Sequence, residues 1–564
     1  MPENYPTPPD SQDATTPEEL DKALSRLVGA KSKWPTVPPE KRATLLRECL
    51  TDIQAVSDEW VAASCRAAGV HRNSTVEGEI WVSQMMPIVR NMRMLVAALD
   101  QNGQPSLPGQ RTHSNGQTIA SVFPSDFREG LMFQGFSAEV WIETNKTASQ
   151  GQAYQSPSSE SQICAIMGAG NSASIPCMDV LYKLFVDNEL VILKLNPVND
   201  YIGPYIVRTF RALIESNIMT VVYGGGDIGA YLCQHASVDT IHITGSQRTH
   251  DLIVWGNTPD EIRNNKAKNT PKLDKPITSE LGCVSPCIVV PGAWSQADID
   301  YQARQIVSMG TQNVGFNCNA VNVVIFPKGW EHTDSLKARI EHHLTLKQQR
   351  KAYYPGSVDR HREIKSRYDS AKEFGTYGES LFPWLIIPDL KPDAAEPMYQ
   401  TESFCGIISF TELDFSDTQS YLSAAVDFCN QSIDGTLNVT VLIDSKTRKS
   451  EQGAFEKALE NLEYGTIGVN VWDGVGYGMC STTWGAFPKH SVQDVGSGIG
   501  AVHNTYLLDH PQKSIIEGPF KISPTPAWFY DHKNLVSFGK ALFAYESSPS
   551  WINFFRVLFN ALRG

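Results

Sequence analysis

Several features are missing from this 564-residue sequence. There is no basic excess, because 48 Lys and Arg residues stand against 61 Asp and Glu residues and the formal net charge is −13. Nucleic-acid surfaces need clustered positive charge, so we expect no nucleic-acid partner. No stretch approaches the roughly 20 apolar residues that span a bilayer. The first residues also lack the apolar core of a signal peptide, so we expect a cytoplasmic protein.

The spacing of the cysteines indicates neither a disulfide framework nor a metal cluster. Eleven cysteines are spread along the chain, mostly in apolar runs, which is typical of thiols in a reducing compartment. Cys283 and Cys287 lie close together, but no His or Cys pair nearby completes a zinc site. We therefore expect no metal.

The chain is long enough for two or three domains. Residues 1–16 are rich in Pro, Thr and acidic residues, and we expect them to be disordered. Residues 17–99 carry apolar positions at helical spacing, whereas β-like runs alternate with amphipathic helices from residue 163 onward. This alternation predicts an α/β fold with a parallel sheet.

Glycine-rich or turn-forming loops follow the predicted strands of this α/β section. They are GAGN at 168–171, KLNP at 194–197, GGGDIG at 224–229 and TGS at 244–246. Parallel sheets bind ligands at the carboxyl ends of their strands, so we expect a ligand to contact these loops.

A second α/β section begins near residue 277 and contains Cys318, in the run GTQNVGFNCNAVNVVIF at 310–326. A cysteine beside an apolar run is most often an inert core residue. Cys318 instead has three asparagines around it, and Glu280 precedes it in the chain. Since a thiolate is a good nucleophile, Cys318 is a candidate catalytic residue.

Six motifs together resemble the signature of the aldehyde dehydrogenase superfamily. In chain order they are Asn171 in GAGN, Lys194 in VILKLNP, the TGS turn, Glu280 in ELG, Cys318 in NVGFNC and Glu402 in TESF. Each motif alone is weak evidence, whereas six in this order are specific. The likeness covers roughly residues 17–515, and the chain resembles a divergent branch with a C-terminal extension.

The resemblance implies NAD(P)-dependent oxidation of an aldehyde to the carboxylic acid. Cys318 would attack the aldehyde carbon, and its N–H and the Asn171 amide would hold the oxyanion of the thiohemiacetal. After hydride transfer, Glu280 would activate the water that hydrolyses the thioester. From the residues alone, Asn171 could instead cap the following helix, and Glu280 could be a surface acid.

The resemblance also implies that NADP or NAD binds through several of the loops. The expected contacts are Lys194, Gly229, Gly245, Ser246, Glu402 and Phe404. Pro197 stands where a glutamate often binds the adenosine ribose, so a 2′-phosphate would not be repelled. Two further departures are His250, in place of a glycine after TGS, and Phe316, in place of a Gln before the cysteine. Lys194 could alternatively be a solvated lysine.

The segment VWDGVGYGMCSTTWGAF, residues 471–487, resembles the family's substrate funnel. It contributes Trp472, Tyr477 and Trp484 as candidate pocket residues. Such an aromatic funnel favours an apolar aliphatic or aromatic aldehyde over a small charged one. The same residues could equally belong to the core.

The resemblance implies an aldehyde dehydrogenase-like domain organisation. The parts are a Rossmann-type nucleotide-binding domain (17–130 and 160–276), an α/β catalytic domain (277–490), a β oligomerisation arm (131–159 and 495–515) and a C-terminal extension (516–564). The arm, with a strand expected at 502–508, would join a homodimer or homotetramer. The extension ends in an amphipathic helix after Ser550, which would pack on the body or on a neighbouring subunit, with peripheral membrane contact as the alternative.

Two other functions stay open. A coenzyme A-acylating dehydrogenase or acyl reductase would keep the thioester but would have less use for Glu280 as a base. A non-catalytic scaffold is suggested by His250, by Pro197 and by Val284, which departs from the usual ELGGK motif. The presence of all three candidate catalytic residues argues against a scaffold.

Overall fold

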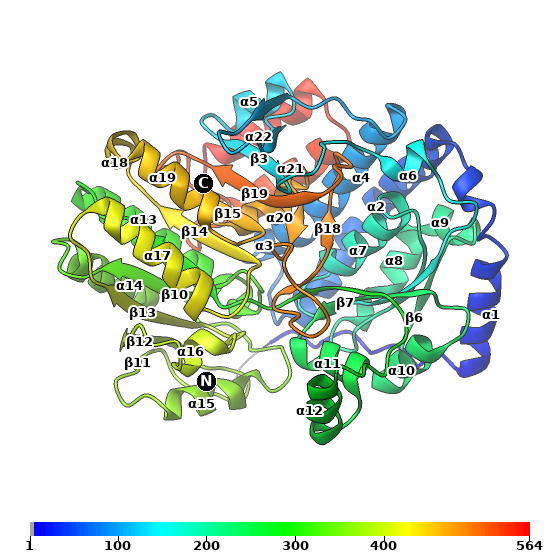
Figure 1. The fold of residues 1–564 in the computed structure, drawn as a ribbon, viewed down its shortest axis with the longest axis horizontal. Coiled ribbons are helices and arrows are strands. Elements are labelled where there is room, and N and C mark those ends of the chain that lie inside the picture. The colour runs from blue at the N-terminus through cyan, green and yellow to red at the C-terminus, as the bar shows by residue number, and fades with distance from the viewer. Residues whose placement is uncertain (1–4) are drawn as a thin grey trace.

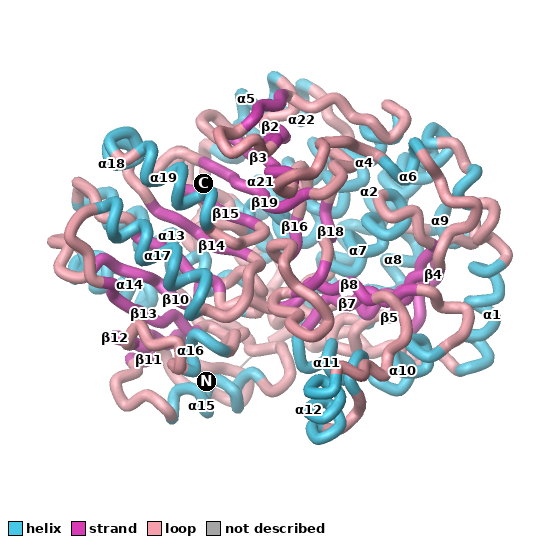
Figure 2. The backbone as a smooth tube through the Cα atoms, in the orientation of Figure 1, coloured by secondary structure: helices cyan, strands magenta, loops and turns pink. Residues whose placement is uncertain are grey.

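The computed structural model describes residues 5–564, which form two large β-sheets, a two-stranded sheet and the helices that cover them (Figure 1). The α/β fold expected from the sequence is confirmed, and most neighbouring strands in both large sheets are parallel. Figure 2 shows the strands of the two sheets in separate halves of the molecule.

The helices have the following bounds: α1 Pro17–Val28, α2 Pro39–Ala67, α3 Glu77–Ile80, α4 Met86–Asp100, α5 Phe127–Met132, α6 Gln152–Gln155, α7 Ser174–Phe185, α8 Gly203–Thr209, α9 Arg211–Glu215, α10 Gly226–Gln234, α11 Gln247–Trp255, α12 Pro259–Lys268, α13 Gln296–Thr311, α14 Thr333–Leu346, α15 Ser357–Ser366, α16 Pro397–Gln400, α17 Thr418–Ser432, α18 Ser445–Ser450, α19 Gln452–Asn461, α20 Gly474–Met479, α21 Leu535–Ser547 and α22 Trp551–Ala561. Shorter helical segments are η1 Trp34–Thr36, η2 Trp81–Met85, η3 Asp200–Ile202 and η4 Gln312–Gly315.

The six-stranded sheet has the order β17-β8-β7-β4-β5-β6. Its strands are β4 Ile163–Met167, β5 Leu190–Lys194, β6 Met219–Val222, β7 Thr240–Gly245, β8 Ile277–Leu281 and β17 Gly498–Ile499. From β4 the chain builds β5 and β6 on one side and then β7 and β8 on the other, all parallel. The order therefore reverses between β4 and β7, which is where such sheets form a binding crevice beyond the carboxyl ends of their strands.

The N-terminal helices share one hydrophobic core with this sheet, in which α2, α4 and α7 contribute buried residues. The expected disorder of residues 1–16 differs from the structure, in which residues 5–16 have no helix or strand but make specific contacts. The Gln12 N–H donates to Asp200 Oδ2 at 3.2 Å, and the Thr15 N–H donates to the Tyr223 carbonyl at 3.1 Å. Hydrogen bonds from its backbone N–H groups to residues of the folded domain hold this segment in place. The amino-acid composition of the segment does not reveal these contacts. Residues 1–4 lie outside the described residues.

The eleven-stranded sheet has the order β1-β2-β3-β19-β15-β14-β9-β10-β13-β12-β11. Its strands are β1 Gly109–Thr112, β2 Thr118–Phe123, β3 Ser137–Ile142, β9 Ser285–Val289, β10 Val321–Pro327, β11 Lys372–Phe374, β12 Trp384–Leu390, β13 Ile407–Leu413, β14 Asn438–Leu442, β15 Thr466–Val469 and β19 Pro511–Glu517. The central strands are parallel, whereas β1–β3 and β11 add antiparallel edges. A second large core lies around the central strands.

Two strands differ from the expected boundaries. The strand that joins the β1–β3 unit to the sheet is β19, whereas the expected strand at 502–508 is only β18, Ala501–His503, paired with β16, Trp484–Gly485. Leu507 and His510 have φ of 53° and 57°, and these left-handed residues interrupt an extended chain. In addition, β8 was expected in the second section but pairs with β7 in the six-stranded sheet.

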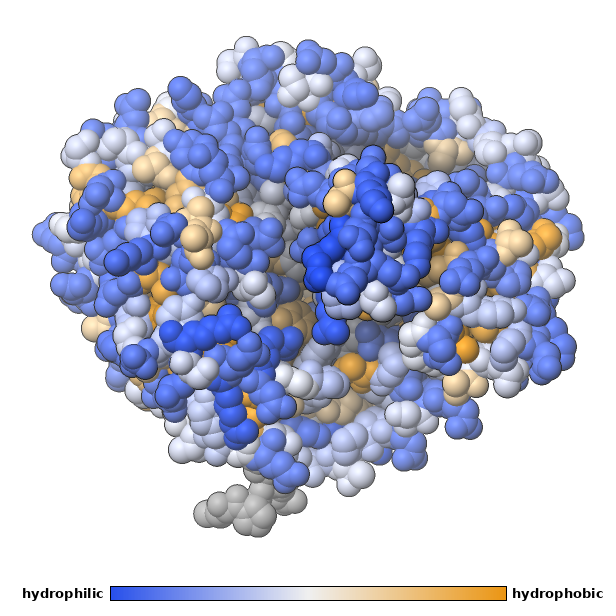
Figure 3. Space-filling model, turned by 60° about the horizontal axis from the view of Figure 1, so that its bottom comes forward, coloured by the Kyte–Doolittle hydropathy of each residue, from blue (hydrophilic) through white to orange (hydrophobic). Residues whose placement is uncertain are grey.

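The C-terminal extension forms α21 and α22, which pack on each other, and α21 also packs on the N-terminal helices α3 and α4. Ser550 caps α22 by accepting a hydrogen bond from the Asn553 N–H. Five large apolar side chains of α22 and its C-cap are exposed: Trp551, Ile552, Phe555, Phe559 and the C-cap residue Leu562. Hydrophilic residues predominate on the face of the molecule shown in Figure 3. No helix within residues 5–564 is both long and apolar enough to cross a bilayer.

Candidate active site

A strained turn presents Cys318. Between α13 and β10, Asn313, Val314 and Gly315 have φ of 50°, 61° and 77°. The left-handed region is costly for a β-branched residue such as Val314. At Gly315 a Cβ would lie 2.7 Å from the backbone of Cys405, so a glycine is required there. Such strain is often found at functional sites. Here the three left-handed residues change the direction of the chain just before the candidate nucleophile Cys318.

Cys318 lies where two cavities meet. A smaller cavity of about 210 Å³ and a larger one of about 910 Å³ both include Asn171, Glu280 and Cys318 in their walls. The larger cavity lies against the loops after β4, β5 and β7, at the carboxyl ends of the six-stranded sheet. The structure therefore brings the three candidate catalytic residues together between two separate binding spaces.

Glu280, in β8, has the properties of a proton acceptor. Its side chain is buried, and the Trp484 Nε1–H donates to Oε1 at 3.3 Å. Burial raises the pKa of Glu280 to about 7, while hydrogen bonds with the Cys318 thiol and Trp484 oppose the rise. Burial also raises the pKa of the Cys318 thiol well above its ordinary value, and Glu280 raises it further. A base with a pKa near 7 is suited to proton transfer at neutral pH.

Asn171 lies in the loop between β4 and α7. Its side-chain amide donates to the Phe316 carbonyl at 2.9 Å, and its own carbonyl accepts from the Tyr353 hydroxyl at 2.9 Å. Since an amide nitrogen carries two hydrogens, one donor is left for a ligand. The alternative role as helix cap does not apply, because the N-cap of α7 is Ala173 and α7 has no side-chain cap.

The departure from the family pattern at Phe316 has a structural explanation. Phe316 is fully buried and packs edge-on against Tyr353 at 5.1 Å between ring centroids, with Tyr354 and Phe404 also in contact. The ring fills an aromatic cluster under the Cys318 turn. Phe316 therefore supports the Cys318 turn by packing against these aromatic rings.

All six candidate cofactor residues line the larger cavity: Lys194, Gly229, Gly245, Ser246, Glu402 and Phe404. Burial and, next in size, the Glu280 carboxylate raise the pKa of Glu402 to about 8. Glu402 Oε1 is buried and has no hydrogen-bond partner among the described residues. His250 is fully buried beside Asp251, and the neighbouring Thr249 faces the cavity instead. His250 thus leaves the approach to the cavity open.

The residues of the larger cavity that sequence reasoning missed include Lys272, Tyr354 and Arg360. The Arg360 guanidinium, on α15, donates to the Phe404 carbonyl at 3.3 Å and lowers the pKa of Glu402. The surrounding sequence, VDRHREIKSR, holds several cations on one helix, and no local signal distinguishes the one that faces the cavity.

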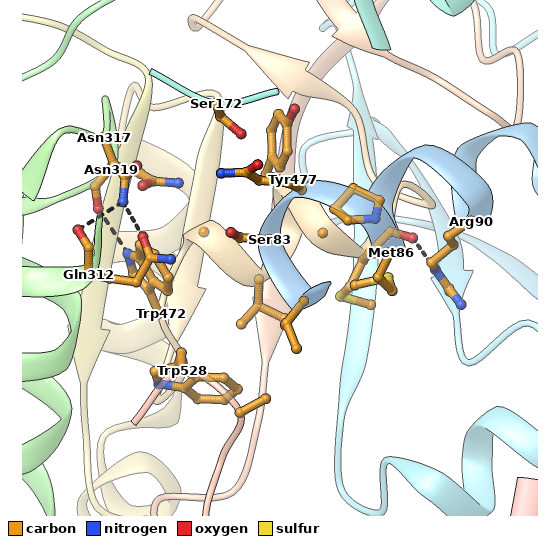
Figure 4. A pocket seen from close by; sticks show the side chains of 18 of the residues that line it. Ser83, Met86, Arg90, Ser172, Gln312, Asn317, Asn319, Trp472, Tyr477 and Trp528 are labelled. Atoms are coloured by element: carbon orange, nitrogen blue, oxygen red, sulfur yellow. Dashed lines mark hydrogen bonds between the residues drawn. The ribbon is translucent and has the colours of Figure 1, made fainter. Parts of the chain in front are cut away.

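The three candidate pocket residues Trp472, Tyr477 and Trp484 all line the smaller cavity. Their polar atoms are anchored, because the Trp472 indole donates to the Asn319 carbonyl at 2.8 Å and the Tyr477 hydroxyl lies 3.0 Å from Ser174 Oγ. Figure 4 shows Trp472 beside Asn319, and Tyr477 near Ser172 and Ser83. These aromatic residues are therefore both packed and cavity-lining.

Sequence comparison agrees with this geometry. Residues 166–367 match the sequence model of the aldehyde dehydrogenase family. This region contains Asn171, Lys194, the TGS turn, Glu280 and Cys318. This match to the aldehyde dehydrogenase family covers less than half of the chain.

Two curated relatives match about a third of this chain at low identity. N-succinylglutamate 5-semialdehyde dehydrogenase 1 of Caulobacter vibrioides is 23% identical over 170 residues, which is 30% of this chain and 32% of that protein. The corresponding enzyme of Ectopseudomonas mendocina is 24% identical over 180 residues, or 32% of this chain and 33% of that protein. The match thus spans about a third of the length of these relatives.

Solved structures share the fold over nearly the whole chain. A Mycobacterium tuberculosis aldehyde dehydrogenase complexed with NAD+ has a TM-score of 0.61 at 16% identity, covering 91% of this chain and 92% of that one. Aldehyde dehydrogenase C of Pseudomonas syringae, complexed with NAD+ and octanal, has a TM-score of 0.59 at 15% identity, covering 93% and 94%. At these identities the likeness concerns the fold.

The described residues in the wall of the smaller cavity include no unpaired cation. Of the described residues in its wall, Arg90 is the one cation, and two glutamates neutralise it. Arg90 Nη1 lies 2.7 Å from Glu546 Oε1, and Nη2 lies 2.7 Å from Glu129 Oε1. Apart from Glu280 at the Cys318 end, the charge of the wall is therefore compensated.

Proposed function

We propose that this protein oxidises an apolar aldehyde to its carboxylic acid, with NADP or NAD as hydride acceptor. The observation that carries the proposal is that Cys318, Glu280 and Asn171 line both cavities at their junction. An aldehyde in the smaller cavity and a nicotinamide in the larger one would both reach the Cys318 thiol. This arrangement gives one cysteine access to two ligands that arrive from opposite sides.

The residues around Cys318 can move protons in both halves of such a reaction. With raised pKa values, Cys318 rests as a thiol and Glu280 can take its proton as the sulfur attacks the carbonyl carbon. The Cys318 N–H and the free hydrogen of the Asn171 amide would stabilise the oxyanion. Once it has released its proton, Glu280 would activate the water that hydrolyses the thioester. Trp484 keeps the Glu280 carboxyl in place.

The larger cavity fits a nicotinamide dinucleotide, which would supply the hydride acceptor. Ser246 caps α11 at the cavity wall, and the N-terminus of such a helix attracts a diphosphate. The orphaned Glu402 Oε1 could accept a hydrogen bond from a ribose hydroxyl. Asn196 and not Pro197 faces the cavity after Lys194, so this loop presents no carboxylate to a 2′-phosphate. We therefore expect both nucleotides to bind.

The smaller cavity favours an uncharged, apolar substrate. Its volume of about 210 Å³ exceeds the roughly 150 Å³ that accommodates benzene in an apolar protein cavity. A ring or a medium-length alkyl chain would fit this space. A semialdehyde with a second carboxylate would bury an unpaired negative charge, because Arg90 is already neutralised. The substrate would then differ from the one in the names of the two curated relatives.

Nicotinamide reduction by the purified protein tests this function. NAD+ and NADP+ would be supplied separately with benzaldehyde, hexanal and a carboxylated semialdehyde, and Cys318→Ser would be the matched control. We expect turnover with the first two aldehydes and none in the variant. Absence of turnover in the wild type, with and without coenzyme A, would overturn the proposal in favour of a non-catalytic scaffold. Formation of an acyl-coenzyme A product would identify the acylating alternative instead.

We further propose a cytoplasmic homo-oligomer, in which the exposed apolar face of α22 contacts a second subunit. Among the described residues all eleven cysteines are free thiols, which is in keeping with a reducing compartment. Trp551 and Phe555 of α22 and its C-cap residue Leu562 are more than half exposed, which leaves an apolar face to be covered. Light scattering on the wild type and on Phe555→Ser would test subunit contact. A monomer that sediments with anionic vesicles would support the membrane alternative.

A further inference from the structure

The C-terminal extension contributes part of the wall of the smaller cavity. Besides the residues near Cys318, this wall includes Ala527, Trp528, Phe538, Leu542 and Glu546. The last three lie on α21, which is more than 200 residues from Cys318 along the chain. Figure 4 places Asn317 and Asn319 on one side of the pocket and Arg90, with Met86 next to it, on the other. Since Glu546 pairs with Arg90, α21 borders the side far from Cys318.

Close packing fixes the distance of α21 from the body. A Cβ added at Gly78 would lie 2.5 Å from Leu535, and one at Gly539 would lie 2.7 Å from Trp81 Cβ. These two glycines let α21 and α3 approach each other without a spacer side chain. The Trp81 and Phe543 rings also meet edge-on, with centroids 5.4 Å apart. The helix therefore cannot move inward, and an outward movement would expose packed apolar surface.

A buried ionic cluster fixes the end of α21. Arg90 and Arg93 of α4 bind Glu546 of α21, at 2.7 Å and 2.6 Å, and Arg90 also binds Glu129 of α5. Arg90 Nε donates in addition to the Met479 carbonyl at 2.6 Å, in the segment that also contributes Tyr477. Two cations and two carboxylates compensate one another. Three parts of the cavity wall are thereby tied together without a net charge that would repel or attract an aldehyde.

We propose that α21 closes the distal end of the aldehyde cavity, and that Phe538 and Leu542 set the length of the alkyl chain that the enzyme accepts. This inference rests on the proposed aldehyde oxidation. The aldehyde carbon lies at Cys318, so carbons added to the tail extend toward α21. Each methylene that the cavity can bury raises kcat/KM by about fourfold, until the chain meets these two side chains.

The test is kcat/KM for a series of linear aldehydes from acetaldehyde to dodecanal. The wild type would be compared with Phe538→Ala, Leu542→Ala and Leu542→Trp. Leu346→Ala, at an exposed position of α14 outside the cavity wall, would be the control. We expect the two alanine variants to move the optimum to longer chains and the tryptophan variant to move it to shorter ones. The kcat/KM for acetaldehyde should change much less than that for long aldehydes, because acetaldehyde does not reach α21, and the control should keep the wild-type profile.

The outcomes separate this inference from the function on which it rests. Turnover of acetaldehyde with chain-length profiles identical to that of the wild type would overturn the role of α21 and leave the proposed function intact. Failure of the wild type to oxidise any aldehyde would overturn both. If Leu542→Trp does not fold, as judged by its melting temperature, the two alanine variants still decide the question.

Discussion

Replacing Glu280 by glutamine is expected to abolish hydrolysis and to stabilise the fold at neutral pH. The pKa of Glu280 is raised from 4.5 to about 7, chiefly by burial. The folded protein thus favours the protonated carboxyl more than the unfolded chain does. The cost of ionising it is absent below about pH 4.5, grows as the pH rises and is complete above about pH 7. A difference of about 2.5 units corresponds to about 3 kcal/mol.

Glutamine is uncharged at every pH and keeps an oxygen that can accept the Trp484 N–H. We therefore expect Glu280→Gln to melt at a higher temperature than the wild type at pH 8, and at nearly the same temperature at pH 4.5. The turnover number should fall by roughly a hundredfold or more, because the general base is lost. Thermal melts at both pH values provide the assay. A stability difference that does not change with pH, or a variant that is less stable at pH 8, would refute the reasoning.

Three further changes test other parts of the site. Trp484→Phe removes a hydrogen bond that lowers the pKa of Glu280, so the rising limb of the pH–kcat profile should move up by about one pH unit. Trp472→Phe is the control and should leave this limb unchanged, because the Trp472 indole donates to a backbone carbonyl. Arg360→Gln should raise KM for the nucleotide about tenfold with little change in kcat, and an unchanged KM would exclude a contact with the cofactor. Glu546→Gln should destabilise the fold by about 3 kcal/mol, because it leaves Arg90 buried and under-compensated. The control is Arg47→Gln, which breaks the exposed ion pair with Asp100 and should lower the free energy of unfolding by less than about 1 kcal/mol. Equal shifts of the denaturant midpoint in the two variants would contradict a stabilising role of the buried cluster around Arg90.

The fold class and the grouping of candidate residues could be predicted because their signals are local. Apolar strands that alternate with helices indicate a parallel sheet, and the carboxyl ends of such strands meet at one edge. This geometry explains why Asn171, Lys194 and Ser246, which follow three separate strands, line one cavity. The polar surroundings of Cys318 could be predicted for the same reason, because the asparagines near it in the structure are also near it in the sequence.

Other features depend on contacts between distant segments. The pairing of Arg90 with Glu546 joins residues 456 positions apart, and neither has an unusual local sequence. The role of α21 in the cavity wall could therefore not be predicted from the extension alone. The misplaced strand at 502–508 reflects positive φ at Leu507, which a residue of that type seldom adopts. His250 seemed a departure at the cofactor site because sequence does not show which way a helical side chain points.

The most direct test of the central claim is a mass measurement of the trapped acyl-enzyme. Glu280→Gln would be mixed with hexanal and NAD+ or NADP+, digested and analysed peptide by peptide. Because this variant lacks the base, attack by Cys318 should be slower while hydrolysis of the thioester is blocked. After a long incubation the account therefore predicts a hexanoyl adduct on the peptide that contains Cys318, together with one equivalent of reduced nicotinamide. An adduct on another cysteine, or nicotinamide reduction without any adduct, would contradict the account.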